Sequence, residues 1–166
     1  MVFIPVAREE MLSKLAARYA DIAGTIAERE ETAQVDYTEP LIPDAEGVVV
    51  TGPAAPEISG LEDLSGQEIY VQQNTAIWDK LVELNEQFRK AGKAPVELVA
   101  ADHNLLEDDI VQAVNAALIP ATVMCDKIAD AWSKVLPHVN VHHDMVVGKG
   151  PCAGPCNAIP RNLKPW

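Results

Sequence analysis

The spacing of apolar and polar positions predicts strands and helices in alternation over residues 58–147. A β-rich run at 68–71 is followed by a helix at 75–91, with Ile77, Leu81, Leu84 and Phe88 on one face. Further strands are predicted at 96–100, 119–124 and 139–142, and further helices at 106–118 and 126–135. This alternation is typical of an α/β fold, with parallel strands and helices on both faces of the sheet.

Before residue 58 the pattern is shorter and more interrupted. Strand-like runs at 2–6, 21–24 and 47–52 accompany a helical pattern at 8–20. Pro53, Pro56 and Gly60 indicate a linker, and we place a domain boundary there. The sequence therefore predicts three parts: residues 1–56, an α/β unit at 57–147, and an irregular tail at 148–166 that is rich in glycine and proline.

Charge and composition narrow the classes of partner. The chain carries 13 basic and 25 acidic residues, a net charge of −12, which opposes binding to nucleic acid or to an anionic membrane. No stretch approaches the length of a membrane span, and the first residues lack the basic start of a secretory signal peptide. Three cysteines, Cys125, Cys152 and Cys156, leave one unpaired if a disulfide forms, so their pairing and the compartment stay open.

Several phrases, taken in their order and spacing, carry a family resemblance. They are VFIPV at 2–6, DIA at 21–23, VDYTEP at 35–40, VVVTGP at 48–53, LEDLSG at 61–66 and VNAALIPATV at 114–123. With them the chain resembles type 2 periplasmic solute-binding proteins of the amino-acid-binding sort (family 3). It resembles most the binding domain of membrane-bound lytic transglycosylases.

The resemblance implies a binding module with two lobes of parallel or mixed sheet that close on a hinge. An amino acid or a peptidoglycan-derived peptide would be held between the lobes, in the periplasm or another extracytoplasmic space, without chemistry or cofactor. Against the family pattern, residues 1–56 form only a partial first lobe, and the catalytic transglycosylase domain has no counterpart. A truncated or degenerate binder is therefore expected, with uncovered edges that favour a homodimer formed by exchange of elements.

The resemblance also implies ligand-binding residues. In the first lobe, Thr25 and Arg29 would bind the ligand carboxylate, although matching backward from Val35 places Glu31 at the arginine position. In the second lobe, the loop Gln73, Asn74 and Thr75 would offer polar groups at a helix N-terminus, and Asp126 would meet the ligand ammonium. Trp78 follows this loop; core packing is its default interpretation, and lining of the cleft is the alternative.

The sequence also allows two other kinds of site, a catalytic cysteine and a metal site. Cys125 opens a predicted helix, where the dipole lowers a thiol pKa, so a small hydrolase using Cys125 with His142 or His143 is the alternative function. An inert buried thiol is the commoner outcome for such a cysteine. His138, His142 and Asp144 have side chains that suit zinc or copper, but the strand period places His143 on the opposite face from His142 and Asp144.

Overall fold

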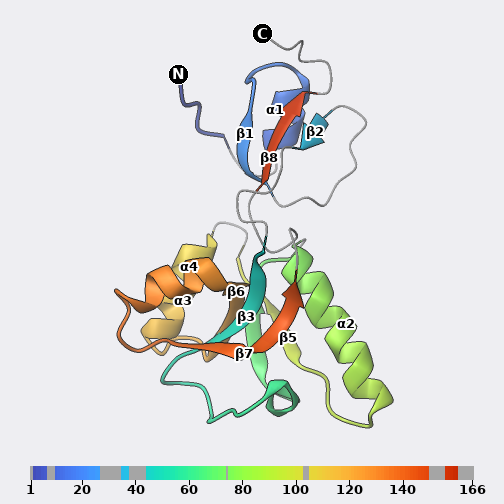
Figure 1. The fold of residues 1–166 in the computed structure, drawn as a ribbon, viewed down its shortest axis with the longest axis vertical. Helices are drawn as coiled ribbons and strands as arrows, with labels where there is room; N and C mark the ends of the chain where they lie inside the picture. The colour runs from blue at the N-terminus through green and yellow to red at the C-terminus, as the bar shows by residue number, and fades with distance from the viewer. Residues whose placement is uncertain are drawn as a thin grey trace.

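The computed structural model describes residues 2–6, 10–26, 35–37, 44–73, 75–102, 105–149 and 156–160. Its strands form two sheets: a three-stranded sheet in the order β1-β8-β2 and a five-stranded sheet in the order β5-β4-β6-β3-β7. The two sheets lie at opposite ends of the long axis of the molecule (Figure 1).

The five-stranded sheet is mixed and mostly parallel. Its strands are β3 (Glu46–Thr51), β4 (Glu68–Val71), β5 (Glu97–Ala100), β6 (Ala121–Cys125) and β7 (Asn140–Lys149). β4 pairs in parallel with β5 and β6, while β3 pairs antiparallel with β6 and β7, so β3 alone opposes the other four strands. The predicted α/β class with a parallel or mixed sheet is confirmed.

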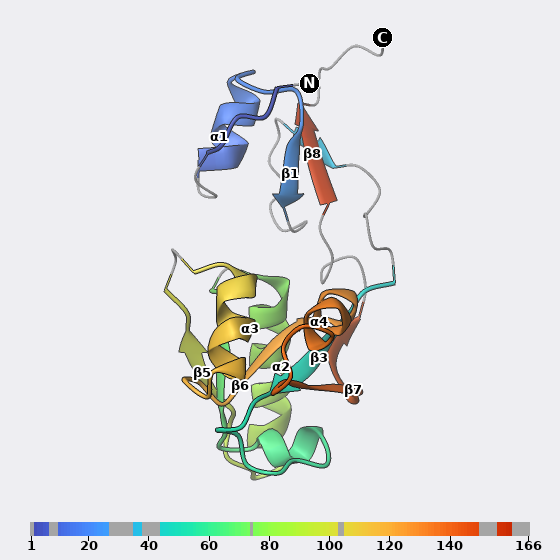
Figure 2. The same cartoon turned by 90° about the vertical axis from the view of Figure 1, so that its left-hand side faces the viewer.

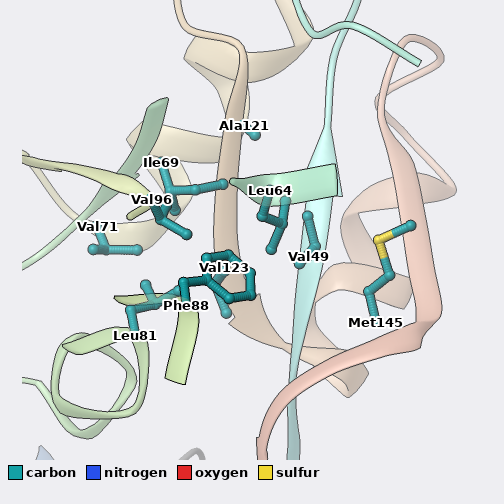
Figure 3. Packing of buried hydrophobic residues seen from close by; sticks show 10 residues of the cluster. All are labelled: Val49, Leu64, Ile69, Val71, Leu81, Phe88, Val96, Ala121, Val123 and Met145. Carbon is teal, nitrogen blue, oxygen red and sulfur yellow. The ribbon is translucent and has the colours of Figure 1, made fainter. Parts of the chain in front are cut away.

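Helices cover both faces of this sheet (Figure 2). α2 (Ala76–Lys90) packs on one face, where Leu81 and Phe88 join a cluster with Val49 of β3 (Figure 3). α3 (Glu107–Asn115) and α4 (Asp126–Ser133) pack on the other face, where Val111 and Ala129 join Val48 and Val50. β3 is buried on both faces, which explains its uninterrupted run of valines.

The ends of α2 and α3 follow from local chemistry. Thr75 caps α2, and Gly92, at φ +72°, ends it in the left-handed conformation. The amide of Lys93 then donates to the carbonyl of Phe88 at 2.9 Å, the bond of a Schellman motif. α3 ends in the same way, but its left-handed residue is Ala117, at φ +58°, which carries a Cβ and is strained.

The small sheet is formed by β1 (Ala23–Ile26), β2 (Val35–Tyr37) and β8 (Cys156–Pro160). β8 lies in the middle and pairs antiparallel with both neighbours. α1 (Met11–Ala16) packs against these strands, and Leu15 is fully buried. The chain therefore leaves the small sheet before β3 and returns to it after β7.

The strands of the structure differ in several places from those that the sequence pattern predicts. β3 precedes the predicted boundary between residues 56 and 57, yet it pairs with β6 and β7, which follow that boundary. β8 lies within the predicted irregular tail, and β7 extends to Lys149, past its predicted end at 142. Residues 2–6 form no regular strand. The positions of these strands depend on pairing between residues that are far apart in the sequence. The periodicity within one segment carries no information about such pairing.

Candidate functional site

A hollow lies at the carboxyl edge of the five-stranded sheet. Here the ends of β4 and β6 meet the first turns of α2 and α3; the hollow is lined by Val71, Gln72, Thr75, Ile77, Glu107, Ile110, Thr122, Val123 and Met124. The end of an α/β sheet beyond the carboxyl ends of its parallel strands is where such folds place ligands. In Figures 1 and 2 this edge faces the small sheet.

The loop between β4 and α2 is held by side chains at the hollow. The buried Thr75 hydroxyl accepts a hydrogen bond from the Trp78 amide at 3.1 Å and donates one to the Gln72 carbonyl at 2.9 Å. The side-chain amide of Gln72 donates a hydrogen bond from Nε2 to the carbonyl of Leu105, in the segment before α3. These bonds tie the first turns of both helices to one loop, so the walls of the hollow are set before any ligand arrives.

The ligand residues that the resemblance implies fall at different places. Thr75 lines the hollow, whereas Gln73 is exposed outside it. Trp78 is half-buried and packs against the core cluster on the α2 face, and it is not among the residues that line the hollow. Asn74, Arg29 and Glu31 lie outside the described residues, as does the side chain of Thr25. The roles of these residues remain predictions.

Asp126 is buried and its carboxylate already has partners. Its Oδ1 accepts from the Glu46 amide at 3.2 Å, and its Oδ2 lies 2.7 Å from Nζ of Lys127. Burial, the largest single influence, raises the pKa of Asp126, but the hydrogen bonds from Lys127 and Glu46 together outweigh it and lower the pKa below its ordinary value. Asp126 is therefore a carboxylate paired within the protein.

The Asp126 contact also lies where the chain passes between the two sheets. Glu46 is the first residue of β3, and its carboxylate lies 2.6 Å from Nζ of Lys149, the last residue of β7. Both chain segments that lead to the small sheet thus start at the carboxyl edge of the five-stranded sheet and are joined by one ion pair. A motion of one sheet relative to the other would act on these residues first.

Cys125 and the two histidines are not brought together. β3 separates β6 from β7, and Cys125 lies opposite Gly47 whereas His142 lies opposite Val49, so two strand spacings, about 10 Å, divide them. His142 instead shares a hydrogen bond of 2.8 Å with Thr51, and His143 lies 3.0 Å from Asp130. Burial raises the pKa of the Cys125 thiol more than the amides of Ile128 and Lys127 lower it. This geometry gives no support to the Cys–His hydrolase alternative.

The predicted metal ligands also stay apart. Within the part of the chain that the structure describes, no three His, Cys, Asp or Glu side chains gather as a metal site would require. His138 is exposed and its amide bonds to Asn115, while Asp144 is exposed on β7. Cys125 is a free, buried thiol; Cys152 and the side chain of Cys156 lie outside the described residues.

Two residues of the hollow, Glu107 and Thr122, were missed by sequence reasoning. Glu107 stands in an acidic group at the start of α3, which is typical of a solvated helix N-terminus. Thr122 is a polar residue within the otherwise apolar β6, and its hydroxyl donates to the Tyr70 carbonyl at 2.7 Å. A buried hydroxyl in an apolar strand was the one signal that could have pointed to Thr122.

Among the described residues, none of the helices has the length and hydropathy needed to cross a bilayer.

Comparisons with known proteins identify the fold. No protein-family model and no curated protein matches the sequence. An ancestral arginine-binding protein bound to arginine matches with a TM-score of 0.65 and 22% identity, over 97% of this chain and 67% of its own. The substrate-binding protein of an amino acid ABC transporter matches with a TM-score of 0.65 and 22% identity, over 95% of this chain and 64% of its own.

A structure reported for glutathione import through GshT and the cystine importer of Streptococcus mutans matches with a TM-score of 0.70 and 16% identity, over 95% of this chain and 64% of its own. At these identities the likeness shows the fold alone, which is that of periplasmic solute-binding proteins. The chain spans about two thirds of the length of these structures.

Proposed function

We propose that this chain is a solute-binding module that binds an amino acid or a peptidoglycan-derived peptide at the carboxyl edge of its five-stranded sheet. The observation that carries the proposal is the coincidence of three features at that edge: the hollow, the first turns of α2 and α3, and the start of β3 beside the end of β7. A ligand bound there would lie at the edge of the sheet from which both chain segments lead to the small sheet, so its binding would be coupled to closure of the small sheet onto this edge.

The neighbours support the class of ligand. They include proteins described as binding arginine and as serving an amino acid transporter, and they share this fold. The contacts of the hollow come from Thr75, Gln72 and Thr122, with Glu107 at its wall. In this proposal Thr25 or Arg29, from the first lobe, would bind the ligand carboxylate. Gln73, Asn74 and Trp78, beside the five-stranded sheet, would border the bound ligand as the two lobes close.

Asp126 takes a different part from the one that the resemblance implies. Because Lys127 and the Glu46 amide already occupy its carboxylate, a ligand ammonium would have to displace Lys127 to reach it. We therefore propose that Asp126 holds the start of β3 in the unliganded protein and is exchanged to the ligand only if closure moves Lys127. A relation to the lytic transglycosylases and an extracytoplasmic location belong to the same proposal, and fractionation of cells producing the protein tests the location.

Titration followed by NMR tests the binding function and its place together. Calorimetry with the twenty amino acids and a set of muropeptides first identifies ligands, and the best of them is titrated into ¹⁵N-labelled protein. The largest amide shift changes are expected at residues 71–73, 75 and 122–124. Gly66 and Gly92, which lie in turns at the opposite edge, serve as internal controls. Absence of binding to the folded protein, or shifts centred on the opposite edge, would contradict the proposal.

Pairing of two chains by exchange of elements stays a proposal as well. It is supported by the exposure of Val2 and Phe3, at 85% and 87%, and by β1 and β2, which pair only with β8 among the described strands. Sedimentation equilibrium over a wide concentration range tests it, and a monomer at every concentration would exclude the exchange.

A further inference from the structure

The edge strand β7 is longer than the strand with which it pairs. It has ten residues, whereas β3, beside it in Figure 1, has six. The neighbouring residues Val49 and Val48 of β3 lie opposite His142 and Val146, so residues 143–145 of β7 have no partner on β3. Extra residues of this kind form a β-bulge, which interrupts the ladder between two strands. β7 therefore pairs with β3 in two separate stretches.

The first of these, the proximal stretch at residues 140–142, is held by side chains as well as by pairing. His142 shares a hydrogen bond of 2.8 Å with the hydroxyl of Thr51, a residue that is 5% exposed. The bulge that follows is also held, because Met145 is buried in the core cluster on the α2 face. These contacts belong to the first half of β7 and do not involve the residues beyond the bulge.

The second, the distal stretch at residues 146–149, has weaker attachments. Among the described strands, β3 is the one neighbour of β7. Val146 and Val147 pack against the core but are only half-buried. Lys149, at 73% exposed, forms the ion pair with Glu46, and exposed ion pairs contribute little to stability. A notch lined by both elements lies between the distal stretch and the first turns of α2.

The start of β3, in contrast, is fixed on both sides. Gly47 lies opposite Cys125 of β6 and opposite Gly148 of β7. The carboxylate of Asp126 also accepts the hydrogen bond from the Glu46 amide. If the distal stretch separated from β3, the pairing with β6 and the contact with Asp126 would remain. The two chain segments that lead to the small sheet are therefore attached unequally.

We infer that the distal stretch of β7 opens from β3 as a unit of its own and is the compliant connection between the two sheets. The proximal stretch, the bulge and the start of β3 keep their places during this opening. Residues 143–145 form the boundary, because the ladder is interrupted there. A displacement of the small sheet is thus absorbed by the returning chain segment and not by β3. This motion is a property of the strands themselves and requires no ligand.

Hydrogen exchange of individual backbone amides, followed by NMR on the full chain, tests the inference. A local opening has a lower free energy than global unfolding and exposes less surface. Protected amides within 146–149 are therefore expected to exchange faster than those within 140–142. Their exchange should also depend less on added urea, since the effect of urea scales with the surface exposed.

Two variants separate the stretches. Thr51→Val removes the hydrogen bond to His142, which persists when the distal stretch alone opens. It should speed exchange within 140–142 about two- to tenfold and leave exchange within 146–149 unchanged. Lys149→Gln removes an ion pair that is lost in either opening, so it should speed exchange in both stretches by a similar factor, up to about fivefold.

Equal acceleration of the two stretches in Thr51→Val would overturn the inference, because β7 would then open as one unit. The same urea dependence in both stretches of the wild-type protein would overturn it as well. Circular dichroism checks that the variants are folded; if Thr51→Val is not, the urea dependence in the wild-type protein carries the test. These measurements are made without ligand, so their outcome is separate from that of the proposed binding function.

Discussion

Replacing Asn85 by alanine should destabilise the protein strongly, because this side chain completes the hydrogen bonding of a buried stretch of backbone. Asn85 lies on the inner face of α2 and is 6% exposed. Its Nδ2 donates to the Val96 carbonyl at 2.9 Å, and its Oδ1 accepts from the Val96 amide at 2.6 Å. Val96 itself is buried, so water cannot readily replace either bond.

The expected magnitude follows from the two groups left without partners. A buried donor or acceptor without a partner costs about 1–3 kcal/mol, so the pair costs about 2–6 kcal/mol. The higher helix propensity of alanine returns roughly 0.5 kcal/mol. A net loss of about 1.5–5.5 kcal/mol is a large part of the roughly 5–15 kcal/mol expected for a domain.

Urea denaturation followed by circular dichroism measures this loss as a lower midpoint with an unchanged m-value. Glu86→Ala is the matched control, since Glu86 is the next residue of α2 and its carboxylate forms an exposed ion pair with Arg89, for which about 0–1 kcal/mol is expected. If Asn85→Ala loses no more stability than Glu86→Ala, the account of Val96 as a buried and otherwise unsatisfied backbone unit is refuted.

Three further changes test other parts of the structure. Gly52→Ala should destabilise by about 1–3 kcal/mol or more in urea denaturation, because the new Cβ would lie 2.2 Å from the Val114 carbonyl oxygen; wild-type stability would contradict this close approach. Ala117→Gly should stabilise by about 1 kcal/mol, since glycine relieves the strain at φ +58°; a loss of stability would be the contrary result. The lowered pKa of Asp126 predicts a stabilising contribution that is present above about pH 4 and is lost as pH falls through the folded-state pKa; Asp126→Asn should flatten the acid limb of the stability profile, and an unchanged limb would contradict this.

The parts of the fold that sequence periodicity predicted well are those whose burial is decided within one element. The strand over 68–71 was predicted with the bounds that the structure shows, and the helix over 75–91 is α2 to within one residue at each end. Thr75 and Gly92 mark those ends because a side-chain cap and a left-handed glycine act within a few residues. The apolar run of Val48, Val49 and Val50 likewise indicated a buried strand.

Sequence periodicity and capping did not show which strands pair with one another. β3 precedes the predicted linker and β8 lies beyond the predicted end of regular structure, and each acquires its place only through pairing with distant strands. The candidate site shows the same limit. Thr75 was expected from the family resemblance, in a polar loop before a helix, whereas Thr122 and Glu107 join it only because β6 pairs with β4 and the first turn of α3 lies at the same edge.

The sequence by itself determined the α/β class, most of the strands and helices of the five-stranded sheet and its covering layers, and the acidic character of the chain. The tertiary structure decided which strands share a sheet, that Cys125 and His142 are held apart by β3, and that the carboxylate of Asp126 is taken by Lys127. The physical reason is that propensity, capping and burial pattern act over a few residues. A hydrogen bond or an ion pair between elements depends instead on the packing of the whole chain.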